Sequence, residues 1–225
     1  MAAKGENPMT DQSAAMRQSL VDAVRAVASK GLNSGTSGNL SLRFGTGGML
    51  ITPTGISPEK LDQAAMVEMT LDGSWNGEIR PSSEWNMHAA IYKAFPEAQA
   101  VVHAHPDHCV ALSCLRQGLP PFHYMIASFG GDDVPCSDYA PFGTTQLAEV
   151  VVRALAKRNT CLIANHGMIA YGPDLAAAVA RTEKLETLAR QYMLASTLGR
   201  PVMLTEDELN VVKNRYKTYG QQKLK

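Results

Sequence analysis

Apolar positions along the first quarter of the chain recur in two different rhythms. Over residues 16–27 they fall at helical spacing, and Gly31 follows as a C-terminal cap. Over residues 40–44 they alternate with polar positions, which predicts a strand. The glycine-rich segment 45–48 then turns the chain into a second strand over 49–52. The chain is therefore expected to begin with a helix and a β-hairpin.

Strands and helices alternate through the rest of the sequence. Further strands are predicted over residues 67–71, 100–105, 123–127, 160–164 and 168–171. Helices are predicted from Ser82 or Ser83 to Ile91 and over 106–115, 145–156, 174–198 and 206–216, with a short helical turn in 61–66. Because tight turns join several neighbouring strands, we expect a single α/β domain with a mixed, mostly antiparallel sheet and helices on both faces.

The ends and the composition narrow the class of protein. Residues 1–10 are polar and predict a disordered tail, whereas residues 11–225 form the expected domain, with a mobile end from about 217. No apolar run is long enough to cross a bilayer. Lys plus Arg and Asp plus Glu both number 21, so nothing steers the chain toward nucleic acid or an anionic membrane. The four cysteines lack C-x-x-C spacing, which favours buried free thiols and a cytoplasmic location.

Three histidines stand at the ends of apolar segments. His103 and His105 are two residues apart on a predicted strand, so their side chains point to the same face. His166 follows another predicted strand. Each motif alone is also typical of surface or structural histidines, but three imidazoles together favour a metal site with one open coordination position. For His88, His108 and His123 the sequence favours hydrogen-bonding or packing roles.

Small and hydroxylated residues gather in three loops. The loops cover residues 35–39, 52–55 and 81–83, and the last of them opens a helix. Hydroxyls, amides and backbone N–H groups at a helix N-terminus can bind an anion. The same residue types are also ordinary turn and cap residues. Glu84 follows the third loop; it either stabilises the helix dipole or acts as a general acid/base beside the metal.

Taken together, these motifs resemble the class II aldolase/adducin family. The similarity is carried by the segments GLNSGTSGNLSLRF, MLITPTGISPEKL, PSSEWNMHAAIY, AVVHAHPDHCVALS and NHGMIAYG, and it continues through HYMIASFGGDDVPC, YAPFGT and YKTYG. The resemblance spans nearly the whole chain, from about residue 16 to residue 220. Asn165, Ser37 and Pro141 depart from the pattern of the sugar-phosphate aldolases in this family.

The resemblance implies a zinc-dependent aldolase that cleaves a ketose 1-phosphate like L-fuculose 1-phosphate into dihydroxyacetone phosphate and a small aldehyde. It implies that His103, His105 and His166 hold zinc or another divalent metal and that Glu84 is the catalytic acid/base. Glu84 is also a possible ligand in the resting state. The implied phosphate-binding residues are Thr36, Gly38, Asn39, Thr54, Gly55, Ser82 and Ser83. Two further catalytic tyrosines are implied, Tyr124 at a neighbouring subunit's site and Tyr219 on a mobile C-terminal tail, in a homotetramer with active sites at its interfaces.

Three alternatives stay open at this point. One is an aldolase for 5-deoxyribulose 1-phosphate or 5-methylthioribulose 1-phosphate, since the departures fall near the aldehyde side. A second is an L-ribulose-5-phosphate 4-epimerase, although epimerases resemble this motif with an aspartate where this chain has Glu84. A third is a non-catalytic, adducin-like binding module, which is expected to lack the full set of metal ligands.

Overall fold

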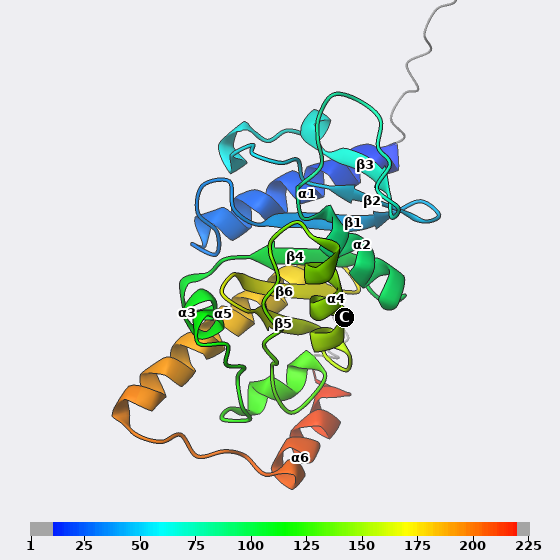
Figure 1. Ribbon diagram of the computed structural model, residues 1–225. Coiled ribbons are helices and arrows are strands. Elements are labelled where there is room, and N and C mark those ends of the chain that lie inside the picture. Colours follow the sequence, from blue (N-terminus) through cyan, green and yellow to red (C-terminus); the bar gives the residue numbers. More distant parts are fainter. Residues whose placement is uncertain (1–10, 220–225) are drawn as a thin grey trace, which may run out of the picture.

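A six-stranded antiparallel sheet forms the centre of the fold in the computed structural model, which describes residues 11–219 (Figure 1). The strands lie in the order β3-β2-β1-β4-β6-β5. Their bounds are β1 Asn39–Phe44, β2 Gly48–Ile51, β3 Val67–Thr70, β4 Ala100–Ala104, β5 Thr160–Ile163 and β6 Gly167–Gly172. Every neighbouring pair of these strands is antiparallel, which confirms the expected sheet.

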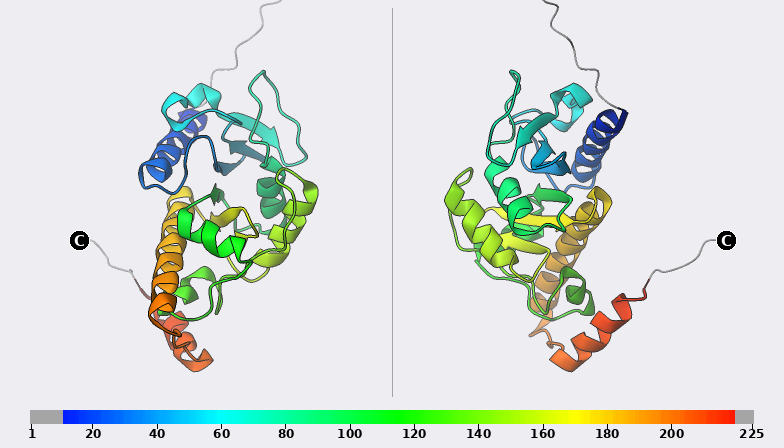
Figure 2. Two further views of the ribbon diagram at one scale, coloured as in Figure 1. Left: turned by 60° about the vertical axis from the view of Figure 1, so that its left-hand side comes forward. Right: turned by 90° about the vertical axis from the view of Figure 1, so that its right-hand side faces the viewer.

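Helices cover both faces of the sheet, as predicted (Figure 2). They are α1 Asp11–Ser29, α2 Trp85–Ala94, α3 Asp107–Cys114, α4 Thr145–Leu155, α5 Leu175–Leu198 and α6 Glu206–Tyr216, with short 3-10 helices η1 Pro58–Lys60, η2 Gln63–Ala65 and η3 Tyr124–Phe129. Alternate strand residues divide the apolar core in two. Val102 packs with α1, α3 and α5, whereas its neighbour Val101 packs with α2 and α4.

The two-sided core explains a feature of β1 that its sequence pattern hides. Leu40 and Leu42 face the layer of α1 and α5, and both are buried. The polar residues between them, Asn39 and Ser41, are buried as well, because they face α2 rather than solvent. The strand register sets Asn39 opposite His103 of β4, so one end of the sheet gathers polar side chains under a helix.

The predicted strand over 123–127 is wrong. The segment forms the 3-10 helix η3, in which the His123 ring accepts the Met125 N–H at 3.2 Å and caps the first turn. Gly130, with φ of 93°, ends the helix. Ile126 and Phe129 are fully buried, three residues apart on one side of η3. A short apolar run does not distinguish such a turn from a buried strand.

Smaller corrections concern caps, cysteines and termini. Helix α2 begins at Trp85 with Glu84 as its N-cap, so neither Ser82 nor Ser83 holds that position. All four cysteines are free thiols, but only Cys109 and Cys161 are buried, whereas Cys136 is half-buried and Cys114 is exposed. The expected N-terminal tail, 1–10, and the last residues, 220–225, lie outside the described residues. Among residues 11–219, none of the helices combines the length and the apolar character that a membrane crossing needs.

Candidate active site

Three histidine rings meet at one end of the sheet. His103 ends up fully buried on β4, on the same face as Val101, and turns toward α2. His105 follows the end of β4, and His166 immediately precedes β6. The three ring centroids are 4.7 to 4.8 Å apart, and one ring nitrogen of each lies within 4.8 Å of the others. The structure thus brings the three predicted ligands into one cluster.

A hydrogen bond orients the His103 ring within this cluster. The Nδ1–H of His103 donates to the Met168 carbonyl at 2.8 Å, which leaves Nε2 facing the other two rings. The Nε2 atoms of His103 and His105 are only 2.9 Å apart. Burial, together with the neighbouring His103, lowers the pKa of His105 to about 3 and that of His166 to about 4. The His105 and His166 rings are therefore neutral at pH 7, the form of histidine that binds metals.

The Glu84 carboxylate closes the cluster from the start of α2. Its Oε2 lies 3.2 Å from His103 Nε2, and its Oε1 lies 3.3 Å from His166 Nε2. Burial alone raises the pKa of Glu84, but the two imidazoles and the Asn39 amide outweigh burial and hold it well below its ordinary value. The residue is 7% exposed, and Oε1 has no hydrogen-bond partner among residues 11–219.

An ionised, buried oxygen without a partner is costly unless a cation faces it. Here that oxygen faces a neutral imidazole rather than a cation. Three imidazoles plus one carboxylate form a donor set that suits zinc or a similar divalent ion. The residues present therefore fit the metal that the sequence resemblance implies.

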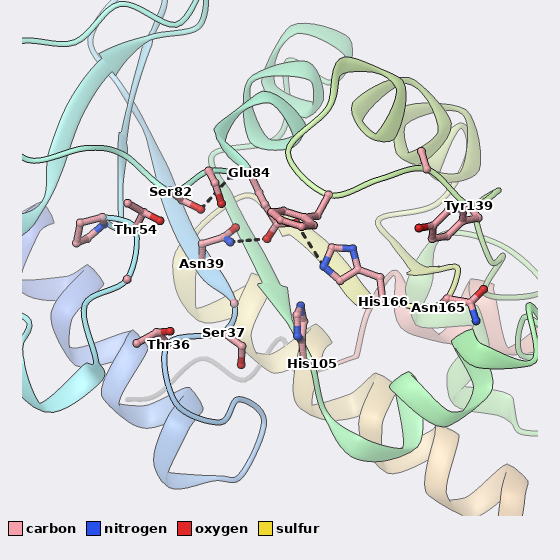
Figure 3. A pocket seen from close by; sticks show the side chains of 16 residues that line it. Thr36, Ser37, Asn39, Thr54, Ser82, Glu84, His105, Tyr139, Asn165 and His166 are labelled. Carbon is pink, nitrogen blue, oxygen red and sulfur yellow. Dashed lines mark hydrogen bonds and ion pairs between the residues drawn. The ribbon is translucent and has the colours of Figure 1, made fainter.

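The three small-residue loops converge beside this cluster and line a cavity of about 320 Å³ (Figure 3). The second and third loops are joined by backbone hydrogen bonds, from Ser82 N–H to the Thr52 carbonyl at 3.0 Å and from Thr54 N–H to the Arg80 carbonyl at 3.1 Å. All seven predicted phosphate-binding residues line the cavity: Thr36, Gly38, Asn39, Thr54, Gly55, Ser82 and Ser83. Glu84, His105 and His166 line it too, so the loops and the histidine cluster share one space.

Asn33 links the first loop to the histidine strand, and the sequence analysis missed it. Its Oδ1 accepts the backbone N–H of His105 at 2.8 Å. A Cβ on Gly38 would lie 2.1 Å from Asn33 Nδ2, and Gly38 has φ of +74°, so only glycine fits there. In the sequence, Asn33 is a loop asparagine two residues after the helix cap Gly31. Asparagine is too common in such loops for this position to indicate a role.

The far wall of the cavity consists of different residues. Tyr139 and Asn165 lie across the cavity from Thr36 and Thr54 (Figure 3). The Arg116 Nε–H donates to Asn165 Oδ1 at 2.9 Å, and the Arg116 guanidinium carbon lies 5.7 Å from the centre of the Tyr139 ring. Phe142, 71% exposed, also lines this side. Tyr139 belongs to the YAPFGT motif, but the sequence analysis did not single it out.

The two predicted catalytic tyrosines lie elsewhere in this chain. Tyr124, on η3, and Tyr219, after α6, are absent from the lining of the cavity above. Both line a separate cavity of about 950 Å³ formed by η3, α5 and the segment around α6. Their exposed fractions are 46% and 80%. A single chain therefore does not bring them to the histidine cluster.

Known proteins match this chain over most of its length. A profile described as Class II Aldolase and Adducin N-terminal domain matches residues 18–193. The 5-methylthioribulose-1-phosphate/5-deoxyribulose-1-phosphate aldolase of Rhodospirillum rubrum is 43% identical over 206 residues, covering 92% of this chain and 93% of that protein. The L-fuculose phosphate aldolase of Escherichia coli is 42% identical over 206 residues, covering 91% and 95%.

A solved structure agrees with the sequence comparisons. An L-fuculose 1-phosphate aldolase superimposes on 95% of this chain and 100% of its own, with a TM-score of 0.87 and 35% identity. The antiparallel sheet and its helices therefore occur in a protein of known structure over almost their full extent. On the profile match and on both relatives, this chain belongs to the class II aldolase and adducin family.

Proposed function

We propose that this protein is a divalent-metal aldolase that cleaves a ketose 1-phosphate into dihydroxyacetone phosphate and a small aldehyde. One observation supports this most strongly: a cluster of three histidines and a buried glutamate opens, through His105, His166 and Glu84, into a cavity lined by three hydroxyl-rich loops. A metal alone would fit a hydrolase as well, and the loops alone would fit any anion. Their combination suits a substrate with a phosphate at one end and vicinal oxygens near the metal.

The loops hold the phosphate in this proposal. Among residues 11–219, no lysine or arginine lines the cavity, so a phosphate there would be bound by hydroxyls, amides and backbone N–H groups. Ser83 and Thr54 are exposed toward solvent, whereas Ser82 and Asn39 are buried behind them. The N-terminus of α2 follows directly and adds a favourable dipole.

The histidine cluster holds the metal, with zinc as the expected ion. When bound there, a divalent ion acts as a Lewis acid toward the substrate's carbonyl oxygen and the charge that develops next to it. His103 is fixed by the Met168 carbonyl and His105 by the bond between its backbone N–H and Asn33. The first contact orients the His103 ring, and the second holds the backbone that carries the His105 ring.

Glu84 moves the proton at the carbon that becomes part of dihydroxyacetone phosphate. In the cleavage direction the C4 hydroxyl loses its proton, the C3–C4 bond breaks, and C3 keeps the electron pair and must gain a proton. Glu84 is the acidic residue among those lining the cavity, and it stands between the phosphate loops and His166. Tyr124 and Tyr219 of a neighbouring subunit are proposed to serve the aldehyde side.

The same tyrosines support a proposed homotetramer with interface sites. Both are exposed aromatic side chains that lie away from the cavity of their own chain. An enzyme of this kind, with four free thiols, is proposed to work in the cytoplasm. Size measurement by light scattering tests the assembly: a monomer that is fully active would contradict the tyrosine assignments.

Two classes of ketose 1-phosphate are candidates for the substrate of this protein. The relatives at 42% and 43% identity are named for L-fuculose phosphate and for 5-methylthioribulose 1-phosphate or 5-deoxyribulose 1-phosphate, so identity does not choose between them. A third relative, from Bacillus thuringiensis and 34% identical, is named for 5-deoxy-D-ribulose 1-phosphate. These sugars share the phosphate end and differ at the aldehyde end, where Tyr139, Phe142 and Asn165 line the cavity.

The deciding experiment measures dihydroxyacetone phosphate release from L-fuculose 1-phosphate and from 5-deoxyribulose 1-phosphate by coupled NADH oxidation. The ratio of the two kcat/KM values names the substrate class. If neither sugar is cleaved by metal-loaded protein, a sugar-phosphate epimerase assay comes next. If the protein holds no stoichiometric metal and cleaves nothing, the binding-module alternative replaces the proposal.

A further inference from the structure

A row of buried polar side chains runs from Glu84 into the core between the sheet and α2. Asn39 Nδ2 donates to Glu84 Oε2 at 2.9 Å, and Asn39 Oδ1 lies 2.5 Å from His88 Nε2. His88 Nδ1 lies 2.7 Å from Ser41 Oγ, which lies 2.8 Å from the Tyr92 hydroxyl. Asn39 and Ser41 come from β1, and the other three come from the start of α2 and from α2 itself.

All five side chains are shielded from water. His88 and Ser41 are 0% exposed, Tyr92 is 2% exposed, and Asn39 and Glu84 are 5% and 7% exposed. Leaving any of these groups without a partner would destabilise the fold, because a buried polar group has lost its hydrogen bonds to water. A layer that could have been filled with apolar side chains instead holds a continuous hydrogen-bonded row that ends on the Glu84 carboxylate.

The bond that the Asn39 amide donates to Glu84 fixes the direction of the other bonds in the row. A carboxylate only accepts, so the Asn39 amide must turn its NH₂ toward Glu84 and its oxygen toward His88. His88 must then carry its proton on Nε2 and donate it to that oxygen. The bare Nδ1 accepts from the Ser41 hydroxyl, and Ser41 in turn accepts from the Tyr92 hydroxyl.

We propose that His88 is a positioning residue for the Glu84 carboxylate and acts on it through the Asn39 amide. The Glu84 carboxylate favours the orientation in which the Asn39 NH₂ faces it. In the flipped orientation its oxygen would face a carboxylate oxygen at about the same distance, which is repulsive. With its NH₂ facing Glu84, the Asn39 amide turns its oxygen toward His88, where it needs a donor. The Nε2–H of His88 supplies that donor, so both ends of the amide are hydrogen-bonded in this orientation.

The same row explains why a histidine stands four residues after Glu84. That spacing puts both side chains on one face of α2. Asn39, directly opposite His103 in the sheet register, fills the space between them. The inference rests on the proposed function for its kinetic part, because it assigns Glu84 as the group that moves the proton.

A double-mutant cycle separates positioning from simple packing. The variants are His88→Phe, His88→Gln and Asn39→Ala, with Tyr92→Phe as the matched control at the far end of the same row. We expect His88→Phe to lower kcat about 10- to 100-fold at full metal content, and His88→Gln, which keeps an N–H at the Nε2 position, to recover most of it. In the Asn39→Ala background, His88→Phe should change kcat less than about 2-fold. Tyr92→Phe should lower stability but leave kcat per folded protein within about 3-fold.

A second readout needs no activity. Nitrogen-15 NMR of the histidine rings in metal-free protein should show His88 as the neutral form with its proton on Nε2. A proton on Nδ1 overturns the proposal, and so does an equal loss of kcat from His88→Phe with and without Asn39. If the wild type lacks aldolase turnover while the NMR result holds, the proposed function fails and the hydrogen-bond assignment stands.

Discussion

Replacing Glu84 with glutamine is the sharpest single perturbation of the proposed chemistry. Glutamine has the shape of glutamate, and its amide oxygen can keep the bond that Asn39 donates at 2.9 Å. Its NH₂ then occupies the place of Oε1, 3.3 Å from the His166 Nε2 atom. The fold and the three histidines should therefore be preserved, while the group that carries the proton is removed.

The expected loss of kcat follows from the proposed role of Glu84 as the acid/base. Positioned acid/base groups contribute about 10²- to 10⁴-fold to rates, which corresponds to about 3–5 kcal/mol of transition-state free energy. We expect Glu84→Gln to lower kcat by that factor while the metal content measured by mass spectrometry stays within about 2-fold of wild type. Thermal unfolding should shift by only a few degrees, since no buried group loses a partner.

The assay is dihydroxyacetone phosphate release coupled to NADH oxidation, with Glu149→Gln as the matched control. Glu149 is exposed on α4 and does not line the cavity, so its substitution should leave kcat unchanged. Full activity in Glu84→Gln would refute the assigned role. A loss of activity that parallels a loss of metal would also refute it, because Glu84 would then act as a metal ligand alone.

Three further substitutions test the phosphate loops and the metal cluster. Ser83→Ala should raise KM for the phosphorylated sugar about 10-fold through one lost hydrogen bond to the anion, with little change in stability, as steady-state kinetics and thermal unfolding will show; an unchanged KM contradicts the phosphate site. Gly38→Ala should cost about 1–3 kcal/mol in urea unfolding, because alanine at φ of +74° also meets the Asn33 amide, and wild-type stability would contradict the strain. His105→Ala should weaken metal binding by at least about 100-fold in a chelator competition and remove the metal-dependent rise in melting temperature, and retention of tight binding would exclude His105 as a ligand.

Local patterns in the sequence predicted most of the fold. The long helix after Asp174 and the last helix from Glu206 to Tyr216 have their predicted ends, because each carries a capping residue directly before an apolar rhythm. The segment 123–127 failed for the opposite reason. Its apolar run lacks a clear period, and burial of Ile126 and Phe129 against the core, rather than local propensity, decides its shape.

The residues of the candidate site also divide into those that local sequence patterns predict and those that they do not. His103 and His105 could be predicted, since strand geometry alone puts residues two apart on one face. Their meeting with His166 depends on the pairing of β4 with β6, which the family resemblance implied but no local pattern shows. The hydrogen-bonding role predicted for His88 is confirmed, but its partners Ser41 and Asn39, and the contact of Asn33 with His105, could not be predicted, because each joins segments far apart in the chain. Buried polar rows of this kind look in sequence like half-exposed strands and ordinary helix faces.

The measurement that tests the central claim most directly is sugar-phosphate cleavage before and after metal removal. Protein loaded with zinc to one ion per chain is assayed with both candidate ketose 1-phosphates, stripped with a chelator, assayed again, and then reloaded. The account predicts release of dihydroxyacetone phosphate from at least one sugar, its loss on stripping and its return on reloading. Cleavage that persists in stripped protein, or its absence in protein that holds zinc, would contradict a metal aldolase at this site.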